Sequence, residues 1–261
     1  MRAPRLTTRA RHHPPALVEG CALFLDIDGT LLDLAPTPSA VRVDPGLATL
    51  LPAVRRRLGG ALALVTGRGI TDVDGLFPAL GMPVAGQHGC ERRDAQGTLH
   101  LHAPRTATLV QLRAMFTEFA NRHDGLMLED KGSSLALHYR QAPQLASSVH
   151  RTMREGVAAV GADDYRLEPG KALLEIRPDS RDKGTAIRDF MEERPFRGRC
   201  PVFVGDDRAD EHGFAMVEGM GGWSIKVGRG RTRARYRLLQ VSAVRAWLAA
   251  FSRTEPARGG T

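Results

Sequence analysis

Three short, uninterrupted apolar runs constrain the fold of this chain more than any other feature. They cover residues 21–25, 61–65 and 201–204, and polar residues follow each run at once. A continuous apolar run of this length is typical of a strand that is buried on both faces, as in a parallel sheet. Apolar residues at helical spacing lie between and after these runs, at residues 46–58, 183–193 and 209–218. The alternation predicts an α/β core with a doubly wound parallel sheet.

The segment 103–178 has a different pattern, which indicates an inserted unit. Its apolar spacing predicts two helices, at residues 106–122 and 143–160. Four strands are predicted between and after them, at residues 126–130, 134–140, 165–168 and 172–177. Residues 134–140 alternate with period two, which is typical of a half-exposed antiparallel strand. We therefore expect an inserted α+β cap, or lid, domain. The whole chain is expected to divide into a basic, disordered arm at 1–18, a discontinuous core at 19–102 and 179–252, the cap at 103–178, and a flexible tail at 253–261.

Composition narrows the choice of partner and compartment. The 261 residues include three scattered cysteines, too few for a disulfide framework, so a reducing, cytoplasmic location is expected. No apolar run reaches the roughly 18 residues of a membrane span, so no membrane partner is expected. The net charge of +8 indicates an anionic partner, but aromatic residues make up only 5% of the chain and form no stacking platform for nucleic acid. A small phosphorylated metabolite is the simpler expectation.

The first apolar run ends in Asp26-Ile27-Asp28-Gly29-Thr30, which places two carboxylates close together. A carboxylate is a competent nucleophile toward phosphorus, so we expect Asp26 to attack the phosphoryl group. Asp28, two residues on, points the same way and can protonate the leaving alkoxide before it activates a water. Two adjacent acids repel, so a divalent cation is expected beside them. The alternative for this motif alone is a strand that ends in a turn rich in aspartate.

The other two apolar runs end in groups that complement this acid pair. Thr66-Gly67-Arg68 follows the second run, and a hydroxyl there can bind a phosphoryl oxygen. The third run ends in Gly205 and the acidic residues Asp206, Asp207, Asp210 and Glu211, which offer oxygen ligands for Mg²⁺. Lys183, at the start of a predicted helix, supplies a cation for the phosphoryl charge. Taken singly, each group has a structural alternative as a helix cap, an acidic helix start or a solvated lysine.

Together these motifs resemble a known family. The order DxDGT, then Thr66, then Lys183, then Gly205-Asp206-Asp207 resembles the haloacid dehalogenase superfamily of phosphotransferases. Within it the chain is similar to the trehalose-6-phosphate phosphatases, over about residues 19–251. Gly86-Gln87-His88-Gly89 carries the likeness in the core. The motifs that point to this branch lie in the insert and are Glu129-Asp130-Lys131-Gly132, Leu137-His138-Tyr139-Arg140, Gly170-Lys171 and Glu175-Ile176. The resemblance implies a Rossmann-like core of the haloacid dehalogenase type and hydrolysis of trehalose 6-phosphate in trehalose biosynthesis.

The resemblance also implies roles for individual residues. Asp26 is the expected nucleophile and Asp28 the acid and base, while Thr66 and Lys183 grip the phosphoryl oxygens. Mg²⁺ is expected on Asp26, the main-chain carbonyl of Asp28, and Asp206. Asp207 and Asp210 are expected in or near the outer shell of the metal. The expected substrate-binding residues are Arg68, His88, Lys131, Arg140, Lys171 and Glu175, the last four on a lid that closes over the site.

Several alternatives and one departure remain at this point. Ala209 stands where the family pattern has a threonine, which removes a hydroxyl near the metal loop. Another sugar-phosphate phosphatase, for sucrose or hexose phosphates, would keep the core motifs and differ in the lid. A catalytically silent sensor would be expected to lack Asp26 or Asp28, and both are present. A functional link to a trehalose-phosphate synthase is a further expectation from the family.

Overall fold

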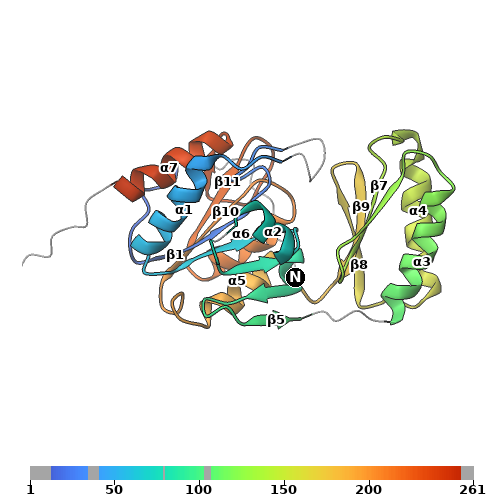
Figure 1. Cartoon of the computed structure of the whole chain (residues 1–261), viewed down its shortest axis with the longest axis horizontal. Helices are drawn as coiled ribbons and strands as arrows, with labels where there is room; N and C mark the ends of the chain where they lie inside the picture. Colours follow the sequence, from blue (N-terminus) through green and yellow to red (C-terminus); the bar gives the residue numbers. More distant parts are fainter. Residues whose placement is uncertain (1–12, 35–40, 79, 103–106, 254–261) are drawn as a thin grey trace, which may run out of the picture. The chain divides into compact units, whose positions relative to one another are not determined.

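The computed structural model describes residues 13–34, 41–78, 80–102 and 107–253. Most of the predicted arm and tail, residues 1–12 and 254–261, lies outside the described residues. The chain forms two compact units, the first made of residues 1–100 and 182–261 and the second of residues 101–181 (Figure 1). No described helix has both the length and the apolar character needed to cross a membrane.

The first unit is built around an eight-stranded sheet. Its order is β12-β11-β10-β1-β2-β3-β4-β5. The strands are β1 Cys21–Leu25, β2 Leu62–Val65, β3 Val84–Gly86, β4 Glu91–Arg93, β5 Leu99–Leu101, β10 Cys200–Gly205, β11 Trp223–Val227 and β12 Tyr236–Leu238. Neighbours from β12 to β3 are parallel, whereas β3 and β4 are antiparallel. The three predicted apolar runs are therefore the central neighbours β10, β1 and β2, and the predicted α/β core with a mostly parallel sheet is confirmed.

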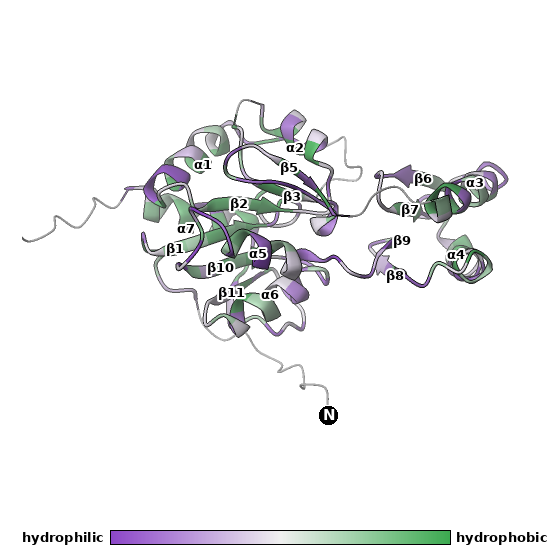
Figure 2. Cartoon of the chain, turned by 90° about the horizontal axis from the view of Figure 1, so that it is seen from below, coloured by the Kyte–Doolittle hydropathy of each residue, from purple (hydrophilic) through white to green (hydrophobic). Residues whose placement is uncertain are grey.

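Apolar contacts explain why these strands lie at the centre. β1 and β2 are buried along their whole length, and Figure 2 colours the central strands as apolar. The Phe24 ring of β1 packs 5.5 Å from Phe196 and 6.0 Å from Phe190, measured between ring centroids. The helices of this unit are α1 Pro45–Arg57, α2 Ile70–Leu76, α5 Lys183–Met191, α6 Asp210–Gly219 and α7 Val241–Arg253. α1 packs beside α7, and α5 packs beside α6.

The second unit is an antiparallel sheet with two helices. Its strand order is β6-β7-β9-β8, and all three pairs are antiparallel. The elements are α3 Ala107–Asn121, β6 Met127–Asp130, β7 Leu135–His138, α4 Ala146–Ala159, β8 Tyr165–Gly170 and β9 Leu173–Pro178. Side chains from both helices and the sheet share one core, which includes Leu109, Phe116, Val149, Met153 and Leu137.

Two local expectations for this unit are wrong. β7 ends at His138, so Tyr139 and Arg140, which the predicted strand included, lie beyond the observed one. Ala136 is as buried as its neighbours Leu135 and Leu137. β7 is an inner strand of this sheet, paired with β6 on one edge and β9 on the other, and its first three residues are buried. The single helix predicted at 143–160 is interrupted at its start by a 3₁₀ turn, Pro143–Leu145.

Candidate active site

The carboxyl ends of β10, β1 and β2 bring the three polar motifs to one edge of the sheet. Parallel strands that neighbour each other end at the same edge, which is where open α/β sheets bind ligands. The backbone N–H of Asp26 still donates to the carbonyl of Val204, at 3.0 Å, so Asp26 stands directly at the end of β1. The N–H of Thr66 donates to the carbonyl of Ala85, at 2.9 Å.

Three of the carboxylates gather into one group. Asp26, Asp206 and Asp210 each offer an oxygen, and these oxygens lie within 4.8 Å of one another. Asp26 is 4% exposed and Asp210 is fully buried. Asp210 was expected in or near the outer shell, whereas its carboxylate stands inside this group. We call these three residues the acid group.

Gly29 allows the loop after β1 to approach the loop after β10. Its φ is +79°, and a Cβ at this position would lie 2.1 Å from Oδ2 of Asp206. No side chain fits at that separation, so the close approach of Asp206 depends on glycine.

Lys183 is the counter-ion of the acid group. Its Nζ donates to Oδ1 of Asp26 and to Oδ1 of Asp210, both at 2.7 Å, and the residue is 3% exposed. The position follows from a capping box at Asp182, whose side chain accepts the N–H of Thr185 while the Thr185 hydroxyl accepts the N–H of Asp182. This cap starts α5 and makes Lys183 its first residue.

Burial and mutual repulsion govern the charges of this group. Burial raises the pKa of Asp26 to about 7, with the charges of Asp206 and Asp207 acting in the same direction and Lys183 against them. Burial, together with Asp210 and Asp207, raises the pKa of Asp206 to about 7. Burial acts to lower the pKa of Lys183, but Asp210 and Asp26 outweigh it, so this pKa lies well above its usual value. Full ionisation of the three carboxyl groups would place more negative charge here than one ammonium offsets, which favours a bound cation.

Asp207 and Asp210 close the loop that begins α6. The N–H of Asp207 donates to Oδ2 of Asp210 at 2.8 Å, and the N–H of Asp210 donates to Oδ1 of Asp207 at 3.2 Å. Burial acts to raise the pKa of Asp207, but Lys183 and the bonds from Asp210 outweigh it, and this pKa is lowered. Ala209 has no side-chain capping bond at the start of α6. The reciprocal Asp207–Asp210 bonds order this loop without the hydroxyl that the family pattern places at position 209.

Asp28 lies outside the acid group and is held by Arg68. The guanidinium Nε donates to Oδ2 of Asp28 at 2.6 Å, and Nη2 donates to Oδ1 at 2.7 Å. This bidentate geometry fixes the orientation of the carboxylate. Arg68 was expected to bind substrate, and here its ion pair is with the expected acid and base.

Thr66 and His88 stand together at the end of β2. Thr66 is 1% exposed, its hydroxyl accepts the N–H of Arg68 at 3.2 Å, and its carbonyl accepts the N–H of His88 at 2.9 Å. His88 has a φ of 56°, and a Cβ on Gly67 would lie 2.8 Å from its Cε1. His88 is close enough to Asp207 to act on its pKa, so it forms part of the wall beside the acidic loop.

The four lid residues form two pairs within the second unit. The Lys131 ammonium donates to Oε1 of Glu175 at 3.3 Å, and the Ser134 hydroxyl donates to the same oxygen at 2.8 Å. Burial acts to lower the pKa of Lys131, but Glu175 and Glu129 outweigh it and raise this pKa. Arg140 donates to the main-chain carbonyl of Lys171 at 3.4 Å.

Thr30 and Lys226 lie at the core site, although the sequence analysis assigned them no role. The buried Thr30 hydroxyl donates to Oδ2 of Asp26 at 3.3 Å, and Thr30 belongs to the same motif as Asp26. Lys226, 5% exposed, acts on the pKa of Asp206 from the neighbouring strand β11. In the sequence, Lys226 is visible only as a lysine within a short apolar run. It becomes a site residue because this run forms β11, the neighbour of β10.

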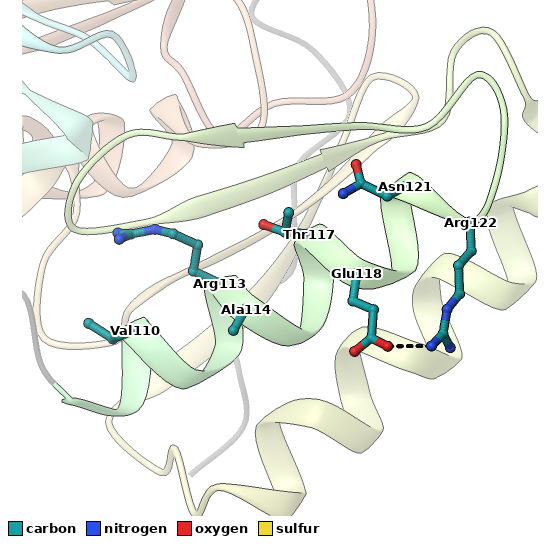
Figure 3. A pocket seen from close by; sticks show the side chains of 7 residues that line it. All are labelled: Val110, Arg113, Ala114, Thr117, Glu118, Asn121 and Arg122. Carbon is teal, nitrogen blue, oxygen red and sulfur yellow. Dashed lines mark hydrogen bonds and ion pairs between the residues drawn. The ribbon is translucent and has the colours of Figure 1, made fainter.

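A shallow hollow on α3 is not a candidate for this chemistry. α3 and the residue that follows it supply all of its lining (Figure 3), namely Val110, Arg113, Ala114, Thr117, Glu118, Asn121 and Arg122. Its carboxylate, Glu118, is paired with Arg122. It lacks the convergent carboxylates that the edge of the parallel sheet provides.

Comparisons with known proteins give a consistent answer. The trehalose-phosphatase family model matches residues 24–242. The chain is 44% identical over 81% of its length to the probable trehalose-phosphate phosphatase of Sinorhizobium fredii, covering 79% of that protein. It is 41% identical over 90% of its length to the trehalose-6-phosphate phosphatase of Escherichia coli K12, covering 87% of it. The C-terminal domain of Candida albicans trehalose-6-phosphate phosphatase has the same fold, with a TM-score of 0.78 at 19% identity over 89% of this chain and 91% of that one.

Proposed function

The chain belongs to the trehalose-phosphatase family, and we propose that it hydrolyses trehalose 6-phosphate to trehalose and inorganic phosphate. The observation that carries this proposal is the position of Asp26 at the end of β1. There its carboxylate meets Lys183 and two further carboxylates from a distant loop. That arrangement suits phosphoryl transfer, which depends on positioning and on neutralising charge.

We propose Mg²⁺ as the cofactor, because the donor set fits it. The acid group consists of oxygen donors from three carboxylates within 4.8 Å, and Mg²⁺ binds to carboxylates, waters and phosphate oxygens. Asp26, Asp206 and Asp210 would hold the ion, together with the main-chain carbonyl of Asp28 expected from the family. When bound, Mg²⁺ would polarise the phosphoryl oxygens and offset the charge that builds up on them.

The side chains would divide the chemistry between two steps. The Asp26 carboxylate attacks phosphorus, the bond to the sugar oxygen breaks, and an aspartyl phosphate forms. Asp28 gives a proton to the leaving oxygen and then takes one from the water that hydrolyses the intermediate. Thr66 and Lys183 bind the phosphoryl oxygens meanwhile. Arg68 occupies one acceptor site on each oxygen of Asp28, so the proton that Asp28 donates would be carried on a remaining lone pair.

The polar pairs of the second unit suit the recognition of sugar hydroxyls. Lys131 and Glu175 supply a donor and an acceptor side by side, and Arg140 and Lys171 supply further donors. A disaccharide carries many hydroxyls and no charge apart from its phosphate, so such mixed pairs match its chemistry. We propose that these four residues, with Arg68 and His88, select the sugar. A functional link to a trehalose-phosphate synthase, which would supply the substrate, is part of the same proposal.

A phosphate-release panel tests this function. Trehalose 6-phosphate, sucrose 6-phosphate and mannose phosphates are compared with and without Mg²⁺, and trehalose 6-phosphate is expected to give the highest kcat/KM, lost on chelation. A higher value for another sugar phosphate would assign the chain to that substrate on the same scaffold.

A pair of variants tests the nucleophile. Asp26→Asn is expected to abolish phosphate release while the fold persists. Asp74→Asn is the matched control, because Asp74 pairs with Arg93 at the surface of the same unit. Near-normal turnover by Asp26→Asn would remove Asp26 from the nucleophilic role.

A further inference from the structure

We propose that a row of exposed arginines beside the acid group, Arg229, Arg231, Arg233 and Arg235, attracts the phosphorylated substrate to the site. We call these four residues the arginine row. The inference rests on the proposed function in one respect only, that the substrate carries a phosphate.

Sheet register places the start of the arginine row at the edge that bears the site. The row then runs back along β11, because Tyr236 is the register partner of Ile225 and Arg235 is therefore level with Ser224. β10 and β11 are parallel neighbours, and Gly205 is the register partner of Lys226. Asp206, the next residue after Gly205, is therefore level with Val227, and the row begins two residues later. Adjacent strands lie about 4.8 Å apart and a residue advances about 3.3 Å, so Arg229 begins on the order of 10 Å from Asp206.

Alternation turns the arginines outward together. Arg229, Arg231, Arg233 and Arg235 are exposed, whereas Thr232 and Ala234 between them are 2% and 4% exposed. An extended segment directs alternate side chains to opposite faces, so the buried residues anchor the segment and the arginines face solvent.

Hydrogen bonds brace this segment. The Arg237 guanidinium donates to the carbonyls of Gly228 and Gly230. The N–H of Arg235 donates to the Ser224 hydroxyl at 2.8 Å, and the N–H of Arg233 donates to Oε2 of Glu211 at 3.0 Å. The charges therefore project from a backbone that is held in place by these bonds.

Most of the charge in the arginine row is available to a ligand. Arg233 lies 3.7 Å from Glu211, and this pair is partly exposed. Arg229, Arg231 and Arg235 form no ion pair with a carboxylate of the described residues, and the Arg235 guanidinium lies over the ring of its neighbour Tyr236. Surface charges of this kind contribute little to stability, so their number in one row has no structural explanation.

The acid group repels the phosphate of an approaching substrate, and the arginine row counters this repulsion. A phosphate dianion that approaches Asp26 meets the carboxyl groups of Asp206, Asp207 and Asp210, of which Asp207 has a lowered pKa, with Lys183 as their buried counter-ion. Positive charge at the rim of the same edge offsets that repulsion and raises the local concentration of an anionic substrate. Over about 10 Å, which is close to the Debye length in about 0.1 M salt, such an effect is strong in dilute buffer and weak in concentrated salt.

The experiment measures kcat/KM of Arg229→Gln/Arg231→Gln for trehalose 6-phosphate across a series of KCl concentrations. We expect a loss of roughly three- to tenfold at low salt and an unchanged kcat. Near 0.5 M KCl, where a separation of about 10 Å is about twice the Debye length, the variant is expected to converge with the unmodified enzyme. The matched control is Arg56→Gln/Arg197→Gln, which removes the same charge from the opposite edge, in the last turn of α1 and before β10. The control is expected to keep kcat/KM within about twofold.

Equal losses in both double variants would overturn the proposal, because net charge alone would then explain them. A loss that does not depend on salt, or one confined to kcat, would overturn it too. Steep, salt-dependent DNA binding that only the row variant loses, with kcat/KM unchanged, would instead assign the row to nucleic acid. p-Nitrophenyl phosphate serves as a second substrate. If trehalose 6-phosphate is not hydrolysed, the proposed function fails, whereas the row is still tested by this ester.

Discussion

Lys183→Met offers the sharpest test of how the acid group is held together. The substitution keeps the volume of the side chain and removes its charge from between Asp26 and Asp210, each 2.7 Å from Nζ. All three side chains are at most 6% exposed, so solvent cannot replace the lost ammonium. Removing one partner of a buried ion pair destabilises a protein by about 3–5 kcal/mol. We expect a loss of this size in the free energy of unfolding at pH 8, in EDTA.

The pH dependence gives this prediction its direction. Burial raises the folded-state pKa of Asp26 to about 7, so its cost to stability grows as the pH rises from the unfolded pKa toward 7 and is complete above that pH. Without Lys183 this pKa rises further. The Lys183 pKa lies well above its usual range, so in the native protein the ammonium is charged at both pH 5 and pH 8. The loss caused by Lys183→Met is therefore expected to be smaller at pH 5 than at pH 8.

Urea unfolding followed by circular dichroism measures both quantities. Adding Asp210→Asn to Lys183→Met is expected to recover part of the loss, because one uncompensated charge is removed with its partner. Lys226→Met is the control, since Lys226 is also buried but its ammonium forms no hydrogen bond with a described residue. A loss below about 1 kcal/mol at pH 8, or an equal loss at pH 5, would refute the reasoning.

Three further predictions concern the metal, the turn and the acid. Mg²⁺ affinity, measured by isothermal titration calorimetry, is expected to rise from pH 6 to pH 8, with proton release on binding below neutrality. The reason is that metal ligands must be deprotonated and the pKa values of Asp26 and Asp206 lie at about 7. Equal affinity at both pH values would contradict this. Gly29→Ala is expected to weaken Mg²⁺ binding and activity at least tenfold, since its Cβ would lie 2.1 Å from Asp206, whereas Gly221→Ala, with a φ of 75° and open space around it, should affect stability alone. Arg68→Ala is expected to lower kcat about 10- to 100-fold, because Asp28 loses both bonds that orient it, and steady-state kinetics with unchanged kcat would exclude this role.

The sequence alone determined the centre of the sheet and the chemistry at its edge. The runs at β1, β2 and β10 are apolar throughout, which is a local signal, and the polar residues that follow them are necessarily at strand ends. Five strands, β3, β4, β5, β11 and β12, were not predicted. Four of them are three residues long, and their existence depends on a neighbouring strand rather than on their own pattern.

Only the tertiary structure decided which charges meet. Lys183 and Asp26 are 157 positions apart, and Arg68 and Asp28 are 40 apart, so no local pattern records either pair. The same holds for Asp210. The sequence analysis expected it in or near the outer shell of the metal, and the fold places its carboxylate within the acid group. Apolar periodicity is a property of neighbouring residues and can be read along the chain. An ion pair depends on how distant segments pack, which sequence spacing does not contain.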